Sequence, residues 1–327
     1  MSLIREAVGG LKRIFTPRAP GLVLALGGGG ARGLAHIGVL QALAEHAIPV
    51  RAVVGTSIGA EIGAFLASGM PLDELTRLAT GFDWKQTLLM FLPDLPAGGL
   101  TSGTNIVSFL RSRIGTRRIE ELAMGYAAVA ADLESGEEVV LDRGELVEAV
   151  RASISLPGLM APHRMGRRLL VDGGVLNPLP FDVARKRFGG PVVAVAVHAG
   201  AQGLQRPPPV APRVRQGAAR ARQLLDQPWL RRAPALRAWF EGYLENYVVK
   251  RREKPYWTAR RVLDQVFDIG QMELVRLRAR THSPDLLLTP DIGGIGALEF
   301  YRAQEAIAAG RRAAEARLDE LRRLVGG

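Results

Sequence analysis

The sequence predicts an α/β fold in which helices cover both faces of a central sheet. Short apolar runs alternate with helical patterns along the chain from Gly21 onward, which is typical of strand–helix–strand units. Two glycine-rich turns, each between a predicted strand and a predicted helix, strengthen this prediction. The 327 residues, 47% of them hydrophobic, are enough to bury one large core or two smaller ones.

The first glycine-rich turn is Gly27–Gly33, between a predicted strand over Leu22–Leu26 and a predicted helix over Leu34–His46. Unpaired N–H groups at a helix N-terminus, together with the helix dipole, can bind an anion or an oxyanion. The turn also fits the dinucleotide-binding pattern G-x-G-x-x-G. That site requires an acidic residue at the end of the second strand. This strand ends in Gly55-Thr56-Ser57 instead, which favours acyl chemistry over nucleotide binding.

The second turn, Gly55-Thr56-Ser57-Ile58-Gly59, follows an apolar run that ends at Val54 and opens a helical pattern. This is the layout of a nucleophile elbow, in which a tight strand-to-helix turn exposes the serine oxygen and the glycines allow close packing. A serine that opens a helix is also a common cap. Ser57 is the candidate nucleophile, and Gly55 and Gly59 are the residues that support the turn.

The apolar run Leu169–Val171 ends in Asp172-Gly173-Gly174. By itself Asp-Gly-Gly is most often a turn, but a serine nucleophile needs a base. The order of an α/β-hydrolase triad, serine then acid then histidine, would be met by Ser57 and Asp172 with His198 or His282. The other histidines are His36, His46 and His163.

These ordered motifs resemble the patatin-like phospholipases, which are serine acyl hydrolases with a Ser-Asp dyad. The matching segments are Gly28–Gly33, Gly55–Gly59, Ala152–Pro157 with Ala161-Pro162, and Asp172–Gly174. Three further segments resemble the bacterial branch related to neuropathy-target-esterase catalytic domains: Gly33–Leu40, Arg118–Glu120 and Asp132–Gly136. The resemblance covers about residues 20–200 and 262–320.

The resemblance implies a three-layer α/β/α sandwich with a mainly parallel central sheet and a site without metal or cofactor. It implies Ser57 as nucleophile and Asp172 as its base. The implied oxyanion hole consists of Gly28, Gly29, Gly30 and Arg32, and the residues that support the motifs are Gly55, Gly59, Gly173 and Gly174.

A carboxylate can serve as the base because an enclosed apolar site raises its proton affinity. We therefore expect a lipid esterase of the phospholipase A or lysophospholipase type that acts through an acyl-enzyme. The alternatives are an esterase with a Ser-Asp-His triad and a lipid-binding or regulatory module that keeps the fold without turnover.

The remaining elements are predicted in chain order. They are a helical turn over Ile119–Leu122, an antiparallel hairpin of Ala127–Ala131 with Glu138–Leu141, a buried strand over Val192–Val197, an apolar run Leu286–Leu288 and a last helix over Leu298–Leu324. The charged outer positions of the last helix are typical of a solvated face. The apolar stretch Trp84–Leu100 is predicted to be core, with an acyl-chain channel as the alternative.

The catalytic domain is predicted over residues 21–204 and 262–327, with a basic, helical insertion over residues 205–261. From Arg206 to Arg261 there are 14 Arg and Lys against four Asp and Glu, so this stretch carries +10 of the formal net charge of +11. Cations with interleaved aromatic residues suit an anionic membrane surface. A solvated surface, a homo-oligomer contact and nucleic acid are the alternatives, and the expected lipid ester substrate favours a membrane over nucleic acid.

Residues 1–20 are predicted as an amphipathic segment, because apolar residues recur there at helical spacing between cations. The segment lacks the apolar core of a signal peptide, and no apolar stretch reaches the roughly 20 residues of a membrane-spanning helix. The chain has no cysteine, which excludes disulfides and fits a reducing compartment. We expect a cytoplasmic enzyme that binds peripherally at the inner membrane surface.

Overall fold

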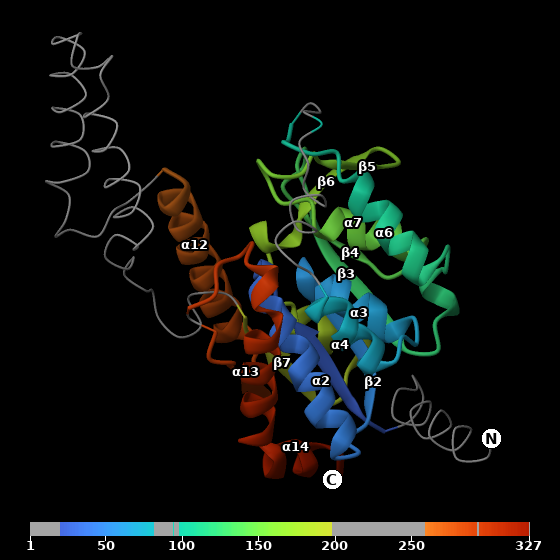
Figure 1. The fold of residues 1–327 in the computed structure, drawn as a ribbon, viewed down its shortest axis with the longest axis vertical. Coiled ribbons are helices and arrows are strands. Elements are labelled where there is room, and N and C mark those ends of the chain that lie inside the picture. Colours follow the sequence, from blue (N-terminus) through green and yellow to red (C-terminus); the bar gives the residue numbers. More distant parts are fainter. Residues whose placement is uncertain (1–19, 82–93, 95–97, 198–258, 293, 327) are drawn as a thin grey trace, which may run out of the picture. The chain divides into compact units, whose positions relative to one another are not determined.

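The computed structural model describes residues 20–81, 94, 98–197, 259–292 and 294–326 (Figure 1). By its internal contacts the chain divides into a larger unit, Met1–Gly203 with Asp268–Gly327, and a smaller unit, Leu204–Phe267. Outside the described residues lie 1–19 of the predicted amphipathic segment, 84–93 and 95–97 of the predicted apolar stretch, 205–258 of the predicted insertion, and His198.

One eight-stranded sheet forms the centre of the larger unit. Its strands are β1 (Leu22–Leu26), β2 (Val50–Thr56), β3 (Gly125–Asp132), β4 (Glu138–Leu141), β5 (His163–Met165), β6 (Arg168–Asp172), β7 (Val192–Val195) and β8 (Leu286–Leu288). Strands β3, β2, β1, β7 and β8 are neighbours in that order and pair in parallel, whereas β4, β5 and β6 join antiparallel. The predicted mainly parallel sheet, the strands at β1 and β7, and the hairpin β3–β4 are confirmed.

Strand β3 has two partners on one of its edges, and this arrangement positions the site. Residues Ala128–Ala131 pair with β4, so β4 occupies one edge. On the other edge β2 runs along β3 up to the pair Thr56 and Val129, and β6 takes over from the pair Asp172 and Ala130. Because β6 is antiparallel to β3, the carboxyl ends of β2 and β6 meet head to head.

Helices complete the fold. The α-helices are α2 (Ala35–Glu45), α3 (Ile58–Ala67), α4 (Leu72–Thr80), α6 (Thr104–Ile114), α7 (Leu146–Ser153), α8 (Phe181–Phe188), α12 (Ala259–Thr281), α13 (Ala303–Glu315) and α14 (Leu318–Gly326). Four 3₁₀ turns accompany them in the described residues: η1 (Gly30–Leu34), η2 (Ile119–Glu121), η3 (Gly173–Val175) and η6 (Phe300–Arg302). The predicted helical turn after residue 118 is η2.

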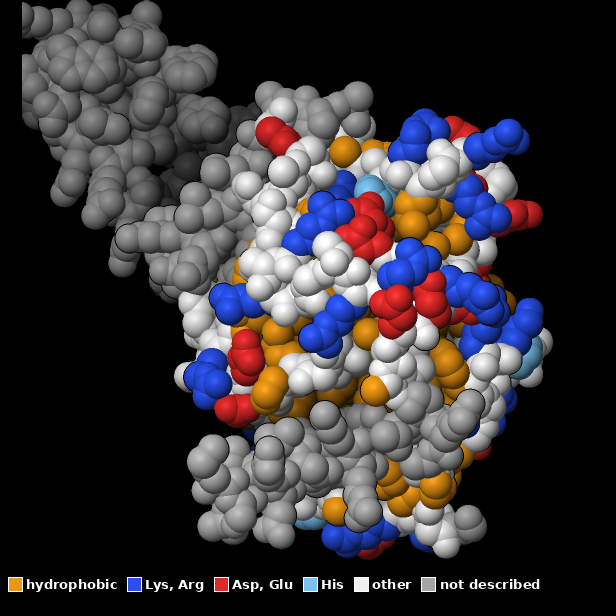
Figure 2. Space-filling view, turned by 90° about the vertical axis from the view of Figure 1, so that its right-hand side faces the viewer, with side chains coloured by type: hydrophobic (Ala, Val, Ile, Leu, Met, Phe, Trp, Pro, Cys, Tyr) orange, Lys and Arg blue, Asp and Glu red, His pale blue; other side chains and the backbone are white. Residues whose placement is uncertain are grey.

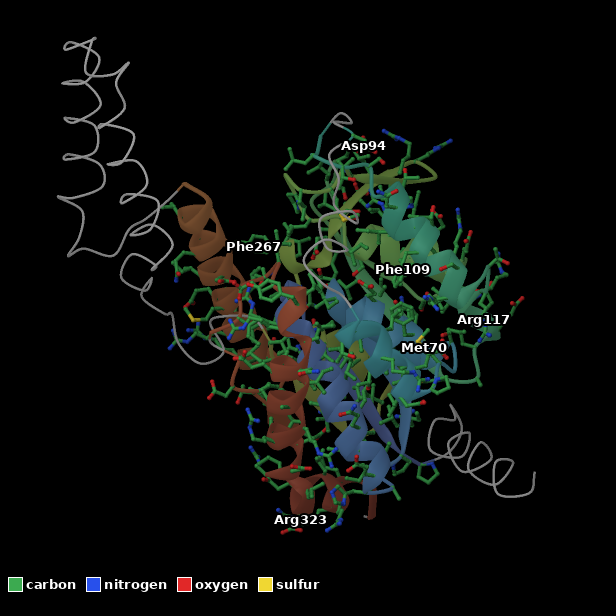
Figure 3. All side chains as sticks on the ribbon, viewed as in Figure 1. Met70, Asp94, Phe109, Arg117, Phe267 and Arg323 are labelled. Atoms are coloured by element: carbon green, nitrogen blue, oxygen red, sulfur yellow. The ribbon has the colours of Figure 1, made fainter. Side chains whose placement is uncertain are left out.

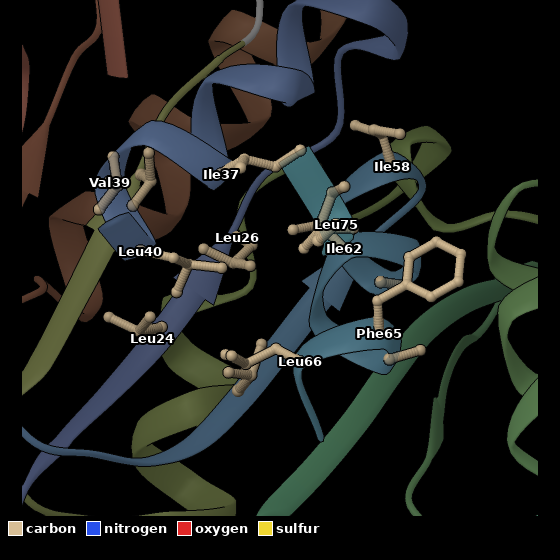
Figure 4. Packing of buried hydrophobic residues seen from close by; sticks show 14 of the residues in the cluster. Leu24, Leu26, Ile37, Val39, Leu40, Ile58, Ile62, Phe65, Leu66 and Leu75 are labelled. Atoms are coloured by element: carbon tan, nitrogen blue, oxygen red, sulfur yellow. The ribbon is translucent and has the colours of Figure 1, made fainter. Parts of the chain in front are cut away.

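The two faces of the sheet carry separate apolar cores, because side chains alternate along each strand. In β1, Leu22, Leu24 and Leu26 face the core under α2, α3 and α13, while Val23 and Ala25 face the core under α8. Figure 4 shows the first of these cores. The structure thus confirms the predicted three-layer α/β/α sandwich.

Aromatic packing fixes α6 against α3. Phe109 of α6, labelled in Figure 3, meets Phe65 of α3 edge to face, with ring centroids 6.5 Å apart and an interplanar angle of 80°. This T-shaped geometry is the preferred one for aromatic pairs. It adds a rigid contact to the helix that follows the Ser57 turn.

The prediction of one last helix over Leu298–Leu324 is wrong. The structure has α13 from Ala303 and a second helix, α14, from Leu318. The chain turns between these two helices, and Leu321 of α14 is fully buried.

The alanine and glycine content of α13 has a packing reason. A Cβ on Gly38 of α2 would lie 1.8 Å from the carbonyl oxygen of Ile307, and one on Gly310 of α13 would lie 1.8 Å from that of Ala35. The two helix backbones are therefore in close contact, and only glycine fits at the crossing.

Charges on the face seen in Figure 2 are of both signs and interspersed. Arg111 of α6 pairs with Glu145 and Glu148, at 3.1 and 2.8 Å. Ion pairs of this exposed kind contribute little to stability. No helix in the described ranges combines the length and the apolar character that a membrane crossing needs.

Candidate active site

Ser57 stands on a strained turn between β2 and α3. Its backbone has φ 56° and ψ −126°, and a positive φ is uncommon for a residue other than glycine. The turn is tight because α3 packs directly on β1: a Cβ on Gly59 would lie 2.1 Å from the carbonyl oxygen of Leu26. A Cβ on Gly55 would likewise overlap the backbone of Gly59 and Ala60. Both predicted supporting glycines are therefore required by backbone contact.

Ser57 Oγ donates a hydrogen bond to Asp172 Oδ2 at 2.5 Å. Although Ser57 occupies the N-cap position of α3, its side chain makes no capping hydrogen bond. The cap interpretation of this serine is therefore wrong, and its hydroxyl is directed at the carboxylate.

Asp172 is 2% exposed, and three hydrogen bonds fix its position, the first of which is the bond from Ser57. Its Oδ1 accepts the N–H of Gly174 at 2.7 Å, and its own N–H donates to the carbonyl of Ser155 at 2.9 Å. Burial raises the pKa of Asp172 to about 6, against the opposing effect of the hydrogen bonds from Ser57 and Gly174. The carboxyl thus combines a fixed position with a raised proton affinity.

The carboxyl end of α7 joins the two sides of the site, a role that the sequence analysis did not assign. Ser153 Oγ accepts the backbone N–H of Ser57 at 2.9 Å and donates to the carbonyl of Val129 at 2.6 Å. Ser155 provides the carbonyl that binds the N–H of Asp172. Ala152 and Ser153 are the last residues of α7, so the motif Ala152–Pro157 begins within a helix and continues beyond its end.

The glycine loop lies beside Ser57 and offers two amides. The N–H of Gly28 donates to the carbonyl of Pro178 at 2.9 Å, so this amide is occupied. A Cβ on Gly28 would lie 3.3 Å from Ser57 Cβ, which shows how closely the loop passes the serine. For the N–H groups of Gly29 and Gly30 the described part of the chain provides no hydrogen-bond acceptor.

Two buried side chains fix the backbone of this loop by binding its carbonyl groups. Arg32 Nε donates to the carbonyl of Gly29 at 3.1 Å, and its Nη2 lies 3.4 Å from Asp268 Oδ1. His36 Nε2 lies 2.9 Å from the carbonyl oxygen of Gly27. Burial lowers the pKa of His36 to about 4, so a neutral His36 donates this hydrogen bond at pH 7.

None of the histidines that the structure describes is hydrogen-bonded to Ser57 or Asp172. His163 Nε2 is bound to Glu148 at 2.7 Å, and His282 is exposed and contacts Thr281. His46 is half-buried and lies beside Arg322. The structure therefore does not support His282 as a triad member, and His198 lies outside the described residues.

The sequence-predicted residues converge, even though 115 positions separate Ser57 from Asp172. Gly28 lies at the elbow and Gly29 and Gly30 follow it in the same loop, while Gly173 and Gly174 form the turn after the acid. In the described part of the chain, no group of three or more His, Cys, Asp or Glu side chains is arranged to hold a metal ion.

A serine on a strained strand-to-helix elbow of a three-layer α/β/α fold, with its hydroxyl hydrogen-bonded to a buried carboxylate, is the arrangement of a serine hydrolase. The chain belongs to the patatin-like phospholipase family, whose model matches residues 24–185. Membership of this family supports lipid hydrolysis as the activity.

Two relatives place the chain more closely. An uncharacterized NTE family protein of Mycobacterium tuberculosis is 34% identical over 338 residues, which cover 94% of each chain. Patatin-like phospholipase domain-containing protein 7 of Rattus norvegicus is 38% identical over 194 residues, which cover 57% of this chain and 14% of that protein. Among solved structures, VipD of Legionella pneumophila aligns with a TM-score of 0.44 at 15% identity and covers 93% of this chain and 67% of its own.

Proposed function

We propose that this chain is a serine lipid acyl hydrolase of the phospholipase A or lysophospholipase type, which cleaves carboxylic esters through a Ser57–Asp172 dyad. The observation that carries the proposal is the 2.5 Å hydrogen bond from Ser57 Oγ to Asp172 Oδ2. A general base has to lie within hydrogen-bond reach of the proton that it removes. Asp172 meets this condition without an intervening histidine.

Asp172 takes the hydroxyl proton while Ser57 Oγ attacks the ester carbonyl. The amides of Gly29 and Gly30 stabilise the oxyanion of the tetrahedral intermediate. When the intermediate collapses, Asp172 returns the proton to the leaving alcohol and Ser57 keeps the acyl group. Asp172 then removes a proton from water as its oxygen attacks the acyl carbon. The bond between Ser57 Oγ and the acyl carbon breaks, Asp172 returns the proton to Ser57 Oγ, and the fatty acid leaves.

The electrostatics of Asp172 agree with this role. A solvated aspartate is a poor base, whereas burial raises the pKa of this carboxyl to about 6. The group is still mostly ionised at pH 7, so it combines a useful proton affinity with the correct protonation state.

A fluorophosphonate label followed by peptide mapping tests the dyad. We expect covalent modification of Ser57 in the parent, none in Ser57→Ala and slow labelling in Asp172→Asn. A parent that is not labelled at Ser57 would contradict the proposal and favour a lipid-binding module without turnover. Labelling that is lost in a folded His198→Ala variant would favour the triad.

We also propose that the basic residues between 205 and 261 draw the enzyme from the cytoplasm to the anionic inner membrane surface. The proposal rests on the net charge of +10 in this stretch, because each cation near such a surface contributes on the order of 1 kcal/mol to membrane binding.

To test this membrane proposal, six cations are replaced by glutamine: Arg231, Arg232, Lys250, Arg251, Arg252 and Lys254. Sedimentation with anionic vesicles is expected to fall sharply, and added salt is expected to weaken the sedimentation of the parent in the same direction. Hydrolysis of a soluble short-chain ester is expected to remain unchanged, and equal vesicle binding by variant and parent would contradict the proposal.

A further inference from the structure

Two buried side chains of α12 contact two separate parts of the candidate site, the glycine loop and the turn after Asp172. Asp268 lies against Arg32 of the glycine loop, and Gln271, one turn later, lies against the turn that follows Asp172. We propose that Asp268 and Gln271 are positioning residues, Asp268 for the oxyanion-binding amide and Gln271 for the base. This inference rests on the proposed function of Ser57 and Asp172.

Asp268 acts on the oxyanion site indirectly, through Arg32 and the peptide group between Gly29 and Gly30. Arg32 binds the carbonyl of Gly29, and this carbonyl shares its peptide group with the N–H of Gly30. The peptide group is planar and trans, so a hydrogen bond that fixes the oxygen on one side directs the N–H to the opposite side. Arg32 therefore sets the direction of the Gly30 amide.

Asp268 in turn sets the position of Arg32. The Arg32 side chain is 10% exposed and the Asp268 side chain is 13% exposed, and their closest nitrogen–oxygen distance is 3.4 Å. Loss of one charge of a buried ion pair leaves the other without compensation, which is strongly unfavourable. Without the carboxylate, the Arg32 guanidinium is expected to move toward solvent and to release the Gly29 carbonyl.

Gln271 contacts the turn that follows Asp172. Its Nε2 lies 3.4 Å from the carbonyl oxygen of Gly174, and the N–H of Gly174 is the donor to Asp172 Oδ1. Space at this point is limited, because a Cβ on Gly174 would lie 2.6 Å from Gln271 Nε2 and 3.0 Å from Asp172 Oδ1. The buried amide of Gln271 thus holds the peptide group that follows Gly174, and through the Gly174 Cα it restricts the preceding peptide group, whose N–H donates to the carboxylate.

A further side chain of α12 anchors the same face of the helix. Arg278 donates to Glu138 Oε2 at 2.9 Å, pairs with Asp182 and donates to the carbonyl of Leu176 at 3.2 Å. Residues 268, 271 and 278 therefore connect α12 to the glycine loop, to the turn after Asp172 and to the segment that follows this turn. These contacts fix the position of α12, as is required if the helix is to position both the glycine loop and the turn after Asp172.

Asp268→Asn tests the first half of the inference. On a soluble short-chain ester we expect kcat to fall about 10-fold or more, because an oxyanion donor is displaced, with KM unchanged. Asp268→Glu keeps the charge and is expected to recover most of this loss. Glu273→Gln is the matched control, since it removes an exposed charge of the same helix that pairs with Arg276, and we expect parental kinetics. Parental kcat in folded Asp268→Asn would overturn the role of Asp268.

If Asp268→Asn does not fold, Arg32→Lys is the second variant for the same link. A lysine keeps the charge facing Asp268 but lacks the guanidinium fork that reaches Asp268 and the Gly29 carbonyl together. We expect a lower kcat with unchanged KM in this variant. Parental kcat in folded Arg32→Lys would overturn the proposed link.

Gln271→Ala tests the second half by a different signature. If the Gly174 N–H moves away from Asp172, the carboxylate loses a hydrogen bond that favours its charged form. The acidic limb of the kcat/KM profile is therefore expected to move to higher pH, whereas Asp268→Asn is expected to leave it in place. An unshifted limb in folded Gln271→Ala would overturn the role of Gln271.

A readout that is independent of turnover separates this inference from the proposed function. In protein labelled with ¹⁵N-glycine, the Gly30 amide resonance is expected to shift in Asp268→Asn and not in Glu273→Gln. A parent that is not labelled by fluorophosphonate at Ser57 overturns the proposed function. An unshifted Gly30 resonance in Asp268→Asn overturns the positioning role, whatever the outcome of the labelling.

Discussion

The two halves of the site are held by different kinds of contact. The Ser57 half is fixed by backbone packed on backbone, as the overlap of a Cβ at Gly59 with the carbonyl of Leu26 shows. The Asp172 half is fixed by hydrogen bonds and burial, with donors at Ser57 and Gly174 and an acceptor at Ser155. The first half is therefore sensitive to added volume, and the second to changes in polarity and pH.

The largest expected effect is the loss of turnover when either half loses its reacting group. Asp172→Asn and Ser57→Ala are each expected to lower kcat on the order of 1,000-fold or more, and to similar extents, because the two residues act as a unit. Steady-state hydrolysis of a short-chain ester measures this. Asp142→Asn, which changes an acid that pairs with Arg187 away from the site, is the matched control. A much smaller loss in Asp172→Asn than in Ser57→Ala would indicate another base.

Added volume at the elbow is expected to affect the folded protein itself. Gly59→Ala places a Cβ 2.1 Å from a backbone oxygen that cannot move independently of β1, so we expect a drop in melting temperature together with loss of activity. Gly270→Ala is the control, because a Cβ there meets no atom within 4 Å. Parental melting temperature and activity in Gly59→Ala would show that the elbow tolerates volume and would remove the contrast between the two halves.

The polarity of the Asp172 half predicts a specific pH dependence. Only the ionised carboxylate can accept the serine proton, and burial raises its pKa to about 6. We therefore expect kcat/KM to rise as the pH increases through 6 and to fall about tenfold per pH unit on the acidic side.

Glu61→Gln is the check on this assignment, because burial also raises the pKa of Glu61, to about 7. The limb should persist in this variant. Its disappearance would assign the limb to Glu61.

The smallest expected effect concerns the contact between the halves. Ser153→Ala leaves the buried N–H of Ser57 and the carbonyl of Val129 without their side-chain partner, which costs about 1–3 kcal/mol. We expect a several-fold lower kcat with little change in KM, while Ser112→Ala, an exposed serine on α6, remains at the parental value. Equal kinetics in Ser153→Ala would show that backbone packing alone holds the nucleophile.

The parts of the site that the sequence predicts are those whose contacts join residues close together in the chain. Ser57 and the strands around it are predictable because an elbow depends on adjacent residues and buried parallel strands are continuous apolar runs. Asp172 needs the motif order as well, since its turn alone is uninformative.

The residues that the sequence analysis missed act through distant partners. Ser153 and Asp268 contact residues 96 and 236 positions away, and no local pattern distinguishes such a serine or aspartate. The end of α13 was missed for a related reason. No proline or glycine separates α13 from α14, and the burial of Leu321 is a tertiary property.

The head-to-head meeting of β2 and β6 makes activity a measure of correct assembly. Strand β6 is held on β3 by three residue pairs, which end at Ala130 and Asp172. A slip by a single residue would turn Asp172 to the opposite face of the sheet while leaving the content of secondary structure almost unchanged. Such a conformer would be invisible to circular dichroism, but its Ser57 would lack a base. The fraction of molecules that reacts rapidly with a fluorophosphonate therefore counts the molecules in which β6 has reached its native register.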